Sequence, residues 1–299
     1  LCDRVGLTHA SKLAPPSTGP EIRSLRPMDV FAADWTAICR RIVTAQQRIF
    51  DRVVTSEERT VYEGVGEGGD HTLVIDRECE DEVFAELEKL GAEGASFVAV
   101  SEERGEVVFG AGGTARVVID PIDGSLNARR TIPSHSLSIA VAAGESMADV
   151  RYGFVHDFGA GDEFVAALGE GAEVNGGAAR VAEGNGRLEV VGLESAEPDW
   201  TVPALHSLAG NAYRLRVVGS IAITAAYVAA GRFDAFLSLR PCRSVDGAAA
   251  QLIVREAGGA VAFGDGPLED APLDLSARYH MAAGRDEDAL AAVRAAQVA

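Results

Sequence analysis

The most informative segment of the sequence is Val117-Val118-Ile119-Asp120-Pro121-Ile122-Asp123-Gly124-Ser125. Its three apolar residues predict a buried strand that delivers two carboxylates, three residues apart, at its C-terminal end. Pro121 fixes the turn between the carboxylates, and Gly124 lets the backbone approach a ligand closely. Ser125 is expected to open a helix, whose free N–H groups would favour a phosphate. The stretch therefore predicts acidic side chains beside an anion pocket.

Two other acidic segments have a similar setting. Glu102 and Glu103 follow an apolar run at residues 97–100, and Asp246 begins a helical pattern of small and apolar residues. Taken alone, a Glu pair after a strand is usually solvated, an Asp before a helix is usually an N-cap, and an Asp-Pro-x-Asp-Gly run can be a simple turn. Carboxylates beside an anion pocket need a cation, however, and Mg²⁺ prefers oxygen ligands that it can share with a phosphate. The three segments together favour a magnesium site.

The wider pattern predicts a mixed α+β and α/β fold. Apolar residues at spacings of three and four predict a helix from residue 34 to about residue 49 and another over 76–90. Short β-type runs follow at residues 97–100, 116–119, 137–141, 152–155 and 163–168. Strands then flank a polar connection, at 188–191 and 215–218. Alternating helices and strands, which indicate an α/β layer, complete the chain at residues 220–230, 233–239, 246–256, 260–263, 279–282 and 287–296.

Clusters of glycine and asparagine near residues 175–187 predict where two halves of the chain meet. We expect an N-terminal α+β domain over residues 28–182 with most of the metal ligands, and a C-terminal α/β domain over 183–299 that completes the site. Residues 1–27 have no apolar periodicity, and we expect a flexible leader there. Met28 follows this segment directly, which suggests the hypothesis that translation begins at Met28.

Composition excludes several classes of function. The chain of 299 residues carries 27 Lys plus Arg against 45 Asp plus Glu, a formal charge of −18, which argues against a nucleic-acid binder. Lys12 and Lys89 are the two lysines, so a Schiff-base lysine or a Walker lysine has no good candidate. The four cysteines are scattered and lack zinc-ligand spacing. No apolar run has the length of a membrane span, and we expect a cytoplasmic protein.

Two motifs resemble the signatures of one known family. The run from Asp120 to Ser125 looks like the first signature of the inositol monophosphatase-like family of Mg²⁺-dependent, often lithium-sensitive sugar-phosphate phosphatases. The run Ser244-Val-Asp246-Gly-Ala-Ala-Ala-Gln-Leu-Ile-Val-Arg-Glu-Ala-Gly-Gly259 is similar to its second signature. The likeness extends from about residue 34 to the C-terminus. It implies the sugar phosphatase fold, a layered α/β/α/β/α sandwich in two parts, and a protein that is usually a homodimer.

The resemblance also implies a set of metal ligands. Glu102, Asp120 and the backbone carbonyl of Ile122 would hold one Mg²⁺. Asp120, Asp123 and Asp246 would hold a second. One ion would lower the pKa of the attacking water and the other would shield the departing alkoxide, so that phosphate and an alcohol are released without a covalent intermediate. Lithium would be an inhibitor.

The catalytic assignments rest on the same resemblance. Asp76 aligns with the family's aspartate that works with a hydroxyl residue to orient the attacking water, and Glu102 belongs to this catalytic set. Ser125 supplies the hydroxyl, at a position where many members have threonine. Gly124 and Ser125 would present backbone N–H groups to the phosphate. Asp70 is a weaker assignment, as a loop carboxylate near a third metal ion.

The expected substrate is a small sugar or polyol phosphate. Inositol-specific relatives have an acidic residue seven positions before the second-signature aspartate, where this chain has Leu239. Arg240 and Arg243 lie close by and could bind the second phosphate of a sugar bisphosphate as planar forks. The alternative is that both arginines pair with surface acids. The runs at residues 124–128 and 234–240 look like the archaeal-type branch, whose members hydrolyse fructose-1,6-bisphosphate and inositol monophosphates.

Three alternative functions stay open at this point. Two keep the chemistry and change the substrate to 3′-phosphoadenosine 5′-phosphate or histidinol phosphate. The third belongs to another class, an inactive homologue that acts as a binding or regulatory protein. The intact acidic set argues against the third alternative. We expect no nucleic-acid or membrane partner.

Overall fold

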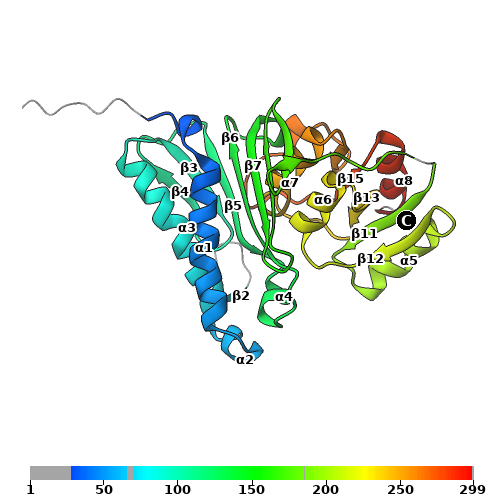
Figure 1. Cartoon of the computed structure of the whole chain (residues 1–299), viewed down its shortest axis with the longest axis horizontal. Coiled ribbons are helices and arrows are strands. Elements are labelled where there is room, and N and C mark those ends of the chain that lie inside the picture. Colours follow the sequence, from blue (N-terminus) through cyan, green and yellow to red (C-terminus); the bar gives the residue numbers. More distant parts are fainter. Residues whose placement is uncertain (1–27, 66–70, 185, 298–299) are drawn as a thin grey trace, which may run out of the picture.

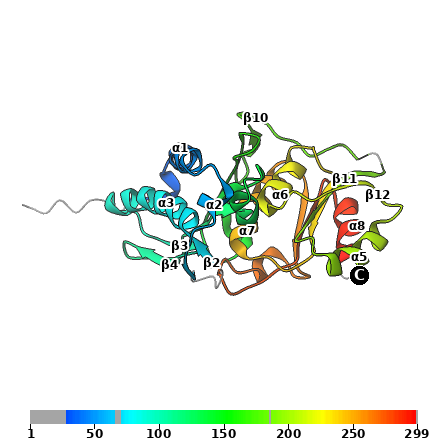
Figure 2. The same cartoon turned by 90° about the horizontal axis from the view of Figure 1, so that it is seen from below.

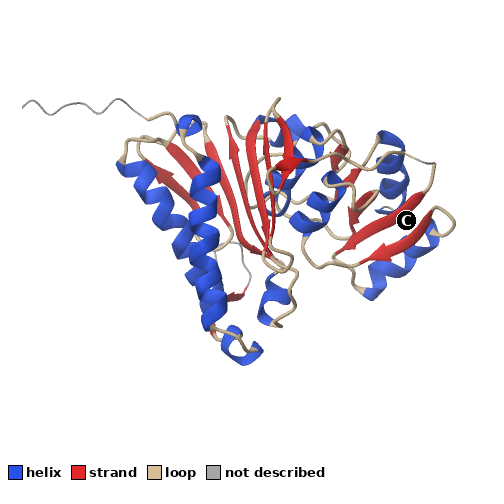
Figure 3. Ribbon diagram, in the orientation of Figure 1, coloured by secondary structure: helices blue, strands red, loops and turns tan. Residues whose placement is uncertain are grey.

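The computed structural model describes residues 28–65, 71–184 and 186–297. Its elements form five layers, helices and sheets in alternation, along the long axis of the molecule (Figures 1 and 3). The predicted layered α/β/α/β/α sandwich is confirmed. The predicted leader over 1–27 and the assignment of Asp70 concern residues outside this description. Both stay predictions, as does the hypothesis that translation begins at Met28.

The first layer consists of two long helices, α1 (Trp35–Arg52) and α3 (Val74–Ala92), which lie side by side on one face of the larger sheet (Figures 1 and 2). The α1 helix begins where predicted, because the Asp34 carboxylate accepts a hydrogen bond from the Ala37 N–H at 2.9 Å. Both helices bury apolar faces against the sheet, as at Ile42, Leu87 and Phe154. Short elements flank this layer, namely η1 (Val30–Ala32), α2 (Ser56–Arg59), β1 (Tyr62–Val65) and β2 (His71–Leu73).

The second layer is an eight-stranded sheet in the order β10-β9-β8-β7-β6-β5-β3-β4. Its strands are β3 (Phe97–Ser101), β4 (Gly105–Phe109), β5 (Arg116–Asp123), β6 (Ser136–Ala142), β7 (Val150–Asp157), β8 (Asp162–Ala167), β9 (Gly171–Val174) and β10 (Gly177–Ala178). All neighbours are antiparallel except β3 and β5, which are parallel with Ser101 opposite Ile119. The residues that follow, Glu102 and Asp120, therefore reach the same edge of the sheet.

The β5 strand is longer than predicted and runs through the acidic motif to Asp123. Its pairing with β6 is regular up to Asp120 and is interrupted between Asp120 and Asp123. Pro121, which has no N–H to donate to the ladder, lies at this interruption. A regular strand would place Asp120 and Asp123 on opposite faces, but with this irregularity both residues line one cavity.

The third layer, α6 (Ile221–Ala229) and α7 (Ser244–Glu256), lies between the two sheets and is rich in small residues (Figure 2). Close packing explains this composition. On β7, a Cβ at Gly153 would lie 2.6 Å from the carbonyl oxygen of Ala249 on α7. The core here is continuous, since side chains of the large sheet, both helices and the second sheet, such as Phe164, Leu252 and Phe236, belong to one cluster.

The fourth and fifth layers are a five-stranded sheet, in the order β12-β11-β13-β15-β14, and the outer helices α5 (Pro198–Leu208) and α8 (Glu287–Gln297). Its strands are β11 (Leu188–Glu194), β12 (Ala212–Arg216), β13 (Ala235–Ser238), β14 (Ala260–Phe263) and β15 (Met281–Gly284). Leu208 on α5 and Val293 on α8 are buried against Leu237 of this sheet. The remaining short elements are α4 (Ser125–Arg129), η2 (Met147–Asp149) and η3 (Leu268–Asp270).

Several expected elements differ from the observed ones. The predicted polar connection contains α5, whose pattern is obscured by an internal Pro203 and by only two buried residues, Ala204 and Leu208. The β4 and β9 strands were not predicted, and β12 and β15 are shifted by two or three residues from the predicted ranges. The predicted domain boundary at 182/183 falls between the two sheets, while α6 and α7, beyond it in sequence, pack on the first sheet. The division into domains stays a prediction.

Within the described ranges, every helix is too short or too polar to cross a lipid bilayer.

The contact between Gly153 and α7 gives a first prediction. Gly153→Ala should lower the free energy of unfolding by about 1–3 kcal/mol, because the added methyl group would overlap the Ala249 carbonyl. The matched control is Gly177→Ala, whose Cβ would meet only the Val174 carbonyl oxygen at 3.5 Å. Urea unfolding of the three proteins measures the difference. Equal stability of the two variants would contradict the close packing of α7 on β7.

Candidate active site

Three carboxylates from three different elements meet at one edge of the large sheet. Glu102 follows β3, Asp120 lies on β5 and Asp246 lies in the first turn of α7. One carboxylate oxygen of each residue lies within 4.8 Å of the others. We call these three residues the acidic trio. The parallel pairing of β3 and β5 places the first two together, and the packing of α7 on the sheet brings the third.

Burial makes the acidic trio electrostatically costly. Burial, followed by repulsion from Glu102, Asp123 and Asp246, raises the pKa of Asp120 well above its ordinary value. Burial and the neighbouring Asp246 raise the pKa of Glu102 to about 8, although Arg243 opposes this shift. Burial and Asp123 raise the pKa of Asp246 to about 7. A bound cation would relieve this repulsion.

The donor chemistry of the acidic trio fits a divalent metal ion. Carboxylate oxygens are the ligands that Mg²⁺ prefers, and converging buried carboxylates whose pKa values are raised in this way are typical of such sites. Asp120 is 3% exposed and is therefore not a solvated surface carboxylate. These residues could therefore hold a metal ion. Ile122 lines the same cavity, and its N–H donates to Asp120 at 3.0 Å.

Asp123 lies outside the acidic trio. Its Oδ2 accepts hydrogen bonds from the Ala222 N–H, at 2.7 Å, and from the Ser220 hydroxyl, at the start of α6. Burial is the main cause that raises its pKa to about 6, and these hydrogen bonds act in the opposite direction. Asp123 nonetheless lines the same cavity, and its role as a ligand of a second metal ion stays a prediction.

The acidic trio lies in the wall of a cavity of about 640 Å³ between the two sheets. Gly124 and Ser125 line the cavity at the start of α4. Gly124 has a φ of 89°, and a Cβ there would lie 2.8 Å from the Gly219 carbonyl oxygen, so only glycine fits both requirements. The cavity therefore combines a metal-binding wall with backbone and hydroxyl groups at the predicted phosphate position.

Asp76 is buried but is not among the residues that line this cavity. Its Oδ2 accepts a hydrogen bond from the Leu73 N–H at 3.0 Å and so caps α3. Burial raises its pKa to about 6, and repulsion from Glu103, next to Glu102, adds to the shift. Its predicted catalytic role stays a prediction.

The arginines predicted to bind substrate are both engaged in ion pairs. Arg240 pairs with Glu197 at 2.5 Å on the rim of the cavity, and Arg243 pairs with Glu102 of the acidic trio. Leu239 is buried in the core between the second sheet and α8, so its side chain does not reach the cavity. Pairing with acids was the alternative that the sequence left open for both arginines.

Sequence reasoning missed Glu194 and Asn127. Glu194 ends β11, lines the cavity and accepts hydrogen bonds from the N–H groups of Val218 and Gly219 and from the Thr224 hydroxyl. Burial raises its pKa to about 8. The Asn127 amide bridges the Ser134 and Val218 carbonyls. A carboxylate directly after an apolar strand, the signal that identified Glu102, could have found Glu194.

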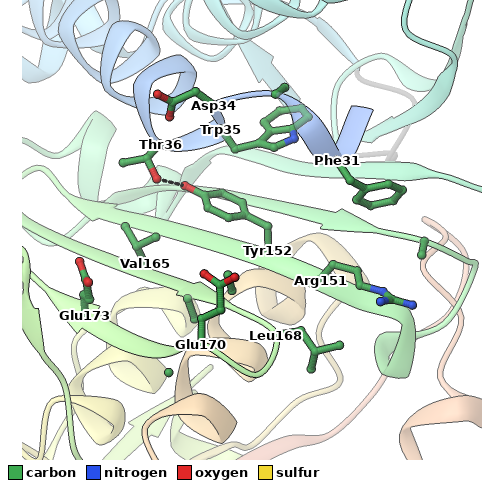
Figure 4. A pocket seen from close by; sticks show the side chains of 15 residues that line it. Phe31, Asp34, Trp35, Thr36, Arg151, Tyr152, Val165, Leu168, Glu170 and Glu173 are labelled. Carbon is green, nitrogen blue, oxygen red and sulfur yellow. Dashed lines mark hydrogen bonds between the residues drawn. The ribbon is translucent and has the colours of Figure 1, made fainter. Parts of the chain in front are cut away.

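A second cavity, of about 810 Å³, lies near the start of α1 and the outward face of β7 to β9 (Figure 4). The Tyr152 hydroxyl and the Thr36 hydroxyl are hydrogen-bonded at 3.0 Å on its wall. Phe31 and Leu168, 40% and 41% exposed, flank it. None of the acidic trio lines this cavity.

Similarity to known proteins identifies the family to which this layered fold and acidic trio belong. A model of the inositol monophosphatase family matches residues 25–298, and the chain belongs to this family. A fructose-1,6-bisphosphatase/inositol-1-monophosphatase from Methanothermobacter thermautotrophicus is 33% identical over 259 residues, which cover 83% of this chain and 91% of the relative. The protein is accordingly a phosphatase, as predicted, of a family that is metal-dependent.

Two further similarities place the chain among its relatives. A crystal structure described as an inositol monophosphatase–fructose 1,6 bisphosphatase superposes with a TM-score of 0.76 and 26% identity, covering 87% of this chain and 98% of that one. A Pseudomonas aeruginosa protein named Nus factor SuhB is 33% identical over 203 residues, 64% of this chain and 72% of the relative. The relatives of this chain are therefore named both as phosphatases and as a Nus factor.

The raised pKa values predict how pH affects the metal-free protein. Burial, followed by the nearby Asp246, raises the pKa of Glu102 from 4.5 to about 8. Between these pH values the folded protein therefore binds more protons than the unfolded chain. The free energy of unfolding should therefore fall as pH rises from about 5 to 8 in EDTA. Mg²⁺ should remove most of this loss, because it binds the ionised carboxylates.

Urea unfolding at pH 5.5 and pH 8, in EDTA and in Mg²⁺, measures this dependence. Glu102→Gln, which removes one of the titrating groups, should flatten the slope in EDTA. If the free energy of unfolding in EDTA does not depend on pH, ionisation of the acidic trio does not destabilise the metal-free protein.

Proposed function

We propose that the protein is a Mg²⁺-dependent phosphomonoesterase that hydrolyses inositol monophosphate, fructose-1,6-bisphosphate or both. The single observation that carries the proposal is the convergence of Glu102, Asp120 and Asp246 in the wall of a cavity that Gly124 and Ser125 also line. The names of the archaeal relatives support the choice of substrates. Two or three ions, and inhibition by lithium, belong to the proposal through the family resemblance.

Each group in the cavity has a task in this proposal. The acidic trio and the Ile122 carbonyl would hold Mg²⁺, which when bound supplies Lewis-acid polarisation of a phosphoryl oxygen and a water of lowered pKa. Ser125 and the backbone of Gly124 would orient the phosphate. Asp76, which does not itself line the cavity, would act with the Ser125 hydroxyl to orient the attacking water, as the family resemblance implies.

Neither the described cysteines nor His135 offers a nucleophile at the cavity. Cys39, Cys79 and Cys242 are buried, and burial raises the pKa of each thiol, which disfavours a thiolate. His135 is also buried, with a pKa lowered to about 4 by its apolar surroundings, and does not line the cavity. This supports direct attack by water, with phosphate and an alcohol as products.

The second phosphate of a bisphosphate would bind at the rim of the cavity. Arg240 is about half exposed and could leave its partner Glu197, itself 57% exposed, at little energetic cost. Arg243 lies deeper, beside the acidic trio. Leu239 offers no acceptor for sugar hydroxyl groups, which favours a bisphosphate over an inositol-specific pocket.

Two other readings are distinguished by the same assay. A nucleotide substrate such as 3′-phosphoadenosine 5′-phosphate, or histidinol phosphate, would keep the metal centre and change the pocket. A binding or regulatory role without catalysis is the other reading, and the name of the Pseudomonas aeruginosa relative keeps it worth testing. The intact acidic trio supports catalysis.

The first test is Mg²⁺-dependent phosphate release from fructose-1,6-bisphosphate, inositol-1-phosphate and 3′-phosphoadenosine 5′-phosphate in parallel. We expect release from the first two, and Asp120→Asn should lower both rates more than about 100-fold, because a central metal ligand loses its charge. Asp265→Asn, at a side chain that is 98% exposed, is the matched control.

Arg240→Ala should slow hydrolysis of the bisphosphate more than hydrolysis of the monophosphate.

Near-normal rates in Asp120→Asn would refute the assigned metal centre. Activity on the nucleotide alone would keep the chemistry and reject the proposed substrates. Mg²⁺ binding without activity on any ester would favour the binding role.

We also propose that two copies associate through the face around the second cavity (Figure 4). Around its apolar floor, Arg151, Glu170 and Glu173 form no ion pair with any residue that the structure describes. In a two-fold dimer, Arg151 of each copy would face the acids of the other, and the exposed Phe31 and Leu168 would be covered.

Sedimentation equilibrium tests this association. We expect a dimer for the wild type, and Arg151→Glu should weaken it at least about tenfold, because like charges would then meet across the interface. Arg48→Glu, on the exposed side of α1, is the matched charge reversal and should leave the dimer intact. A monomeric wild type, or equal association of both variants, would reject this face as the interface.

A further inference from the structure

Arg243 touches two members of the acidic trio at once. It is the N-cap residue of α7, and its backbone N–H donates to the Asp246 carboxylate at 2.7 Å. Its guanidinium donates to the Glu102 carboxylate. The side chains of this ion pair are 13% and 18% exposed, so solvent screens the pair only weakly. A single residue therefore ties the start of α7 to the end of β3.

The guanidinium supplies positive charge where a metal ion would act. Among the ion pairs between described residues, the Arg243–Glu102 pair is the one that involves the acidic trio. Arg243 also lowers the pKa of both Glu102 and Asp246, as a bound cation would. Arg278 acts on Asp246 only through space, from an exposed position where its guanidinium donates to the carbonyls of Leu275 and Ala277.

The ion pair and a metal ion compete for the same carboxylate. Glu102 offers its Oε1 to the guanidinium, and a buried carboxylate that is neutralised by arginine is a poorer metal ligand than a free one. A metal ion that takes Glu102 also repels a guanidinium beside it. Loading of the site therefore weakens the Arg243–Glu102 pair.

We infer that Arg243 is an exchangeable counter-cation of this site: it neutralises Glu102 in the metal-free protein and is released by the metal to bind an anionic oxygen of the phosphate ester. The inference rests on the proposed function and deepens it. It assigns one arginine two successive partners, first a carboxylate and then a phosphate. The exchange makes metal and phosphate bind cooperatively, because each favours the state in which the ion pair is open.

The exchange predicts that a mutation beside the metal site increases Mg²⁺ affinity, which is the opposite of the usual effect. Removal of the guanidinium should tighten Mg²⁺ binding, since the metal no longer displaces it. A residue that merely orients Glu102 would have the opposite effect, because its loss weakens metal affinity by about 10–100-fold. The direction of the change in affinity thus separates a competitor from a positioning residue.

Isothermal titration of the metal-free protein with Mg²⁺ alone tests the inference, at a pH above 8, where Glu102 with its pKa of about 8 is ionised and paired with Arg243. We expect Arg243→Gln to bind Mg²⁺ about tenfold more tightly than the wild type, within the range usual for coupled sites. Arg278→Gln is the matched control, because it removes the same charge near Asp246 without an ion pair to Glu102, and its affinity should change less than about twofold. Arg243→Lys, which keeps the charge, should stay close to the wild type.

Titration with inorganic phosphate completes the test. In the wild type, saturating Mg²⁺ should raise phosphate affinity at least about fivefold, and Arg243→Gln should lose most of this increase. Circular dichroism and thermal unfolding in EDTA establish that each variant is folded. If Arg243→Gln does not fold, Arg243→Lys is compared with the wild type instead. Because it keeps the positive charge, its phosphate affinity should still rise with Mg²⁺.

Unchanged or weaker Mg²⁺ binding by a folded Arg243→Gln would overturn the exchange and leave Arg243 as a positioning residue. Phosphate binding that is indifferent to Mg²⁺ in the wild type would overturn it as well. Absence of Mg²⁺ binding by the wild type is a different failure, because it would reject the proposed metal-dependent function itself.

Discussion

Repulsion among three closely spaced carboxylates is the main energetic cost that this fold has to offset. Glu102 directly follows β3, Asp120 lies on β5 and Asp246 lies on α7, and the fold holds one oxygen of each within 4.8 Å of the others. This arrangement is unfavourable in itself. Burial and nearby carboxylates raise the pKa of all three groups, so the ionised forms are disfavoured. The apolar packing around the site provides the free energy that holds the charges together.

That packing is concentrated in the middle layer. The α7 helix is buried nearly all round and contacts both sheets, so it belongs structurally to both parts of the chain. Asp246 lies in the first turn of this helix, which approaches Gly153 of the large sheet closely at Ala249. A similar link joins Asp123 on β5 to Ser220 and Ala222 at the start of α6. The cavity is thus built across the two sheets rather than within one domain.

Much of this arrangement could be predicted from the sequence, where local signals were strong. Periodicity identified the long helices, and an apolar run that ends in acids identified Glu102 and Asp120 as neighbours. The failures have one physical origin, namely contacts between residues far apart in sequence. No local pattern shows that Glu194 holds the loop at residues 218–219, or that Arg243 pairs with Glu102. The α5 helix was missed because Pro203 and its polar residues hide a helix that packs on α8 and on the second sheet.

Burial of the thiols has a consequence for how the protein responds to oxidants. A phosphatase that attacks with a thiolate is switched off when peroxide converts its sulfur to sulfenic acid. Here Cys39, Cys79 and Cys242 are at most 5% exposed, and their thiols resist deprotonation. Hydrolysis at a carboxylate-held cation needs no sulfur. By the proposed metal-dependent route, peroxide would therefore not stop dephosphorylation through these three thiols.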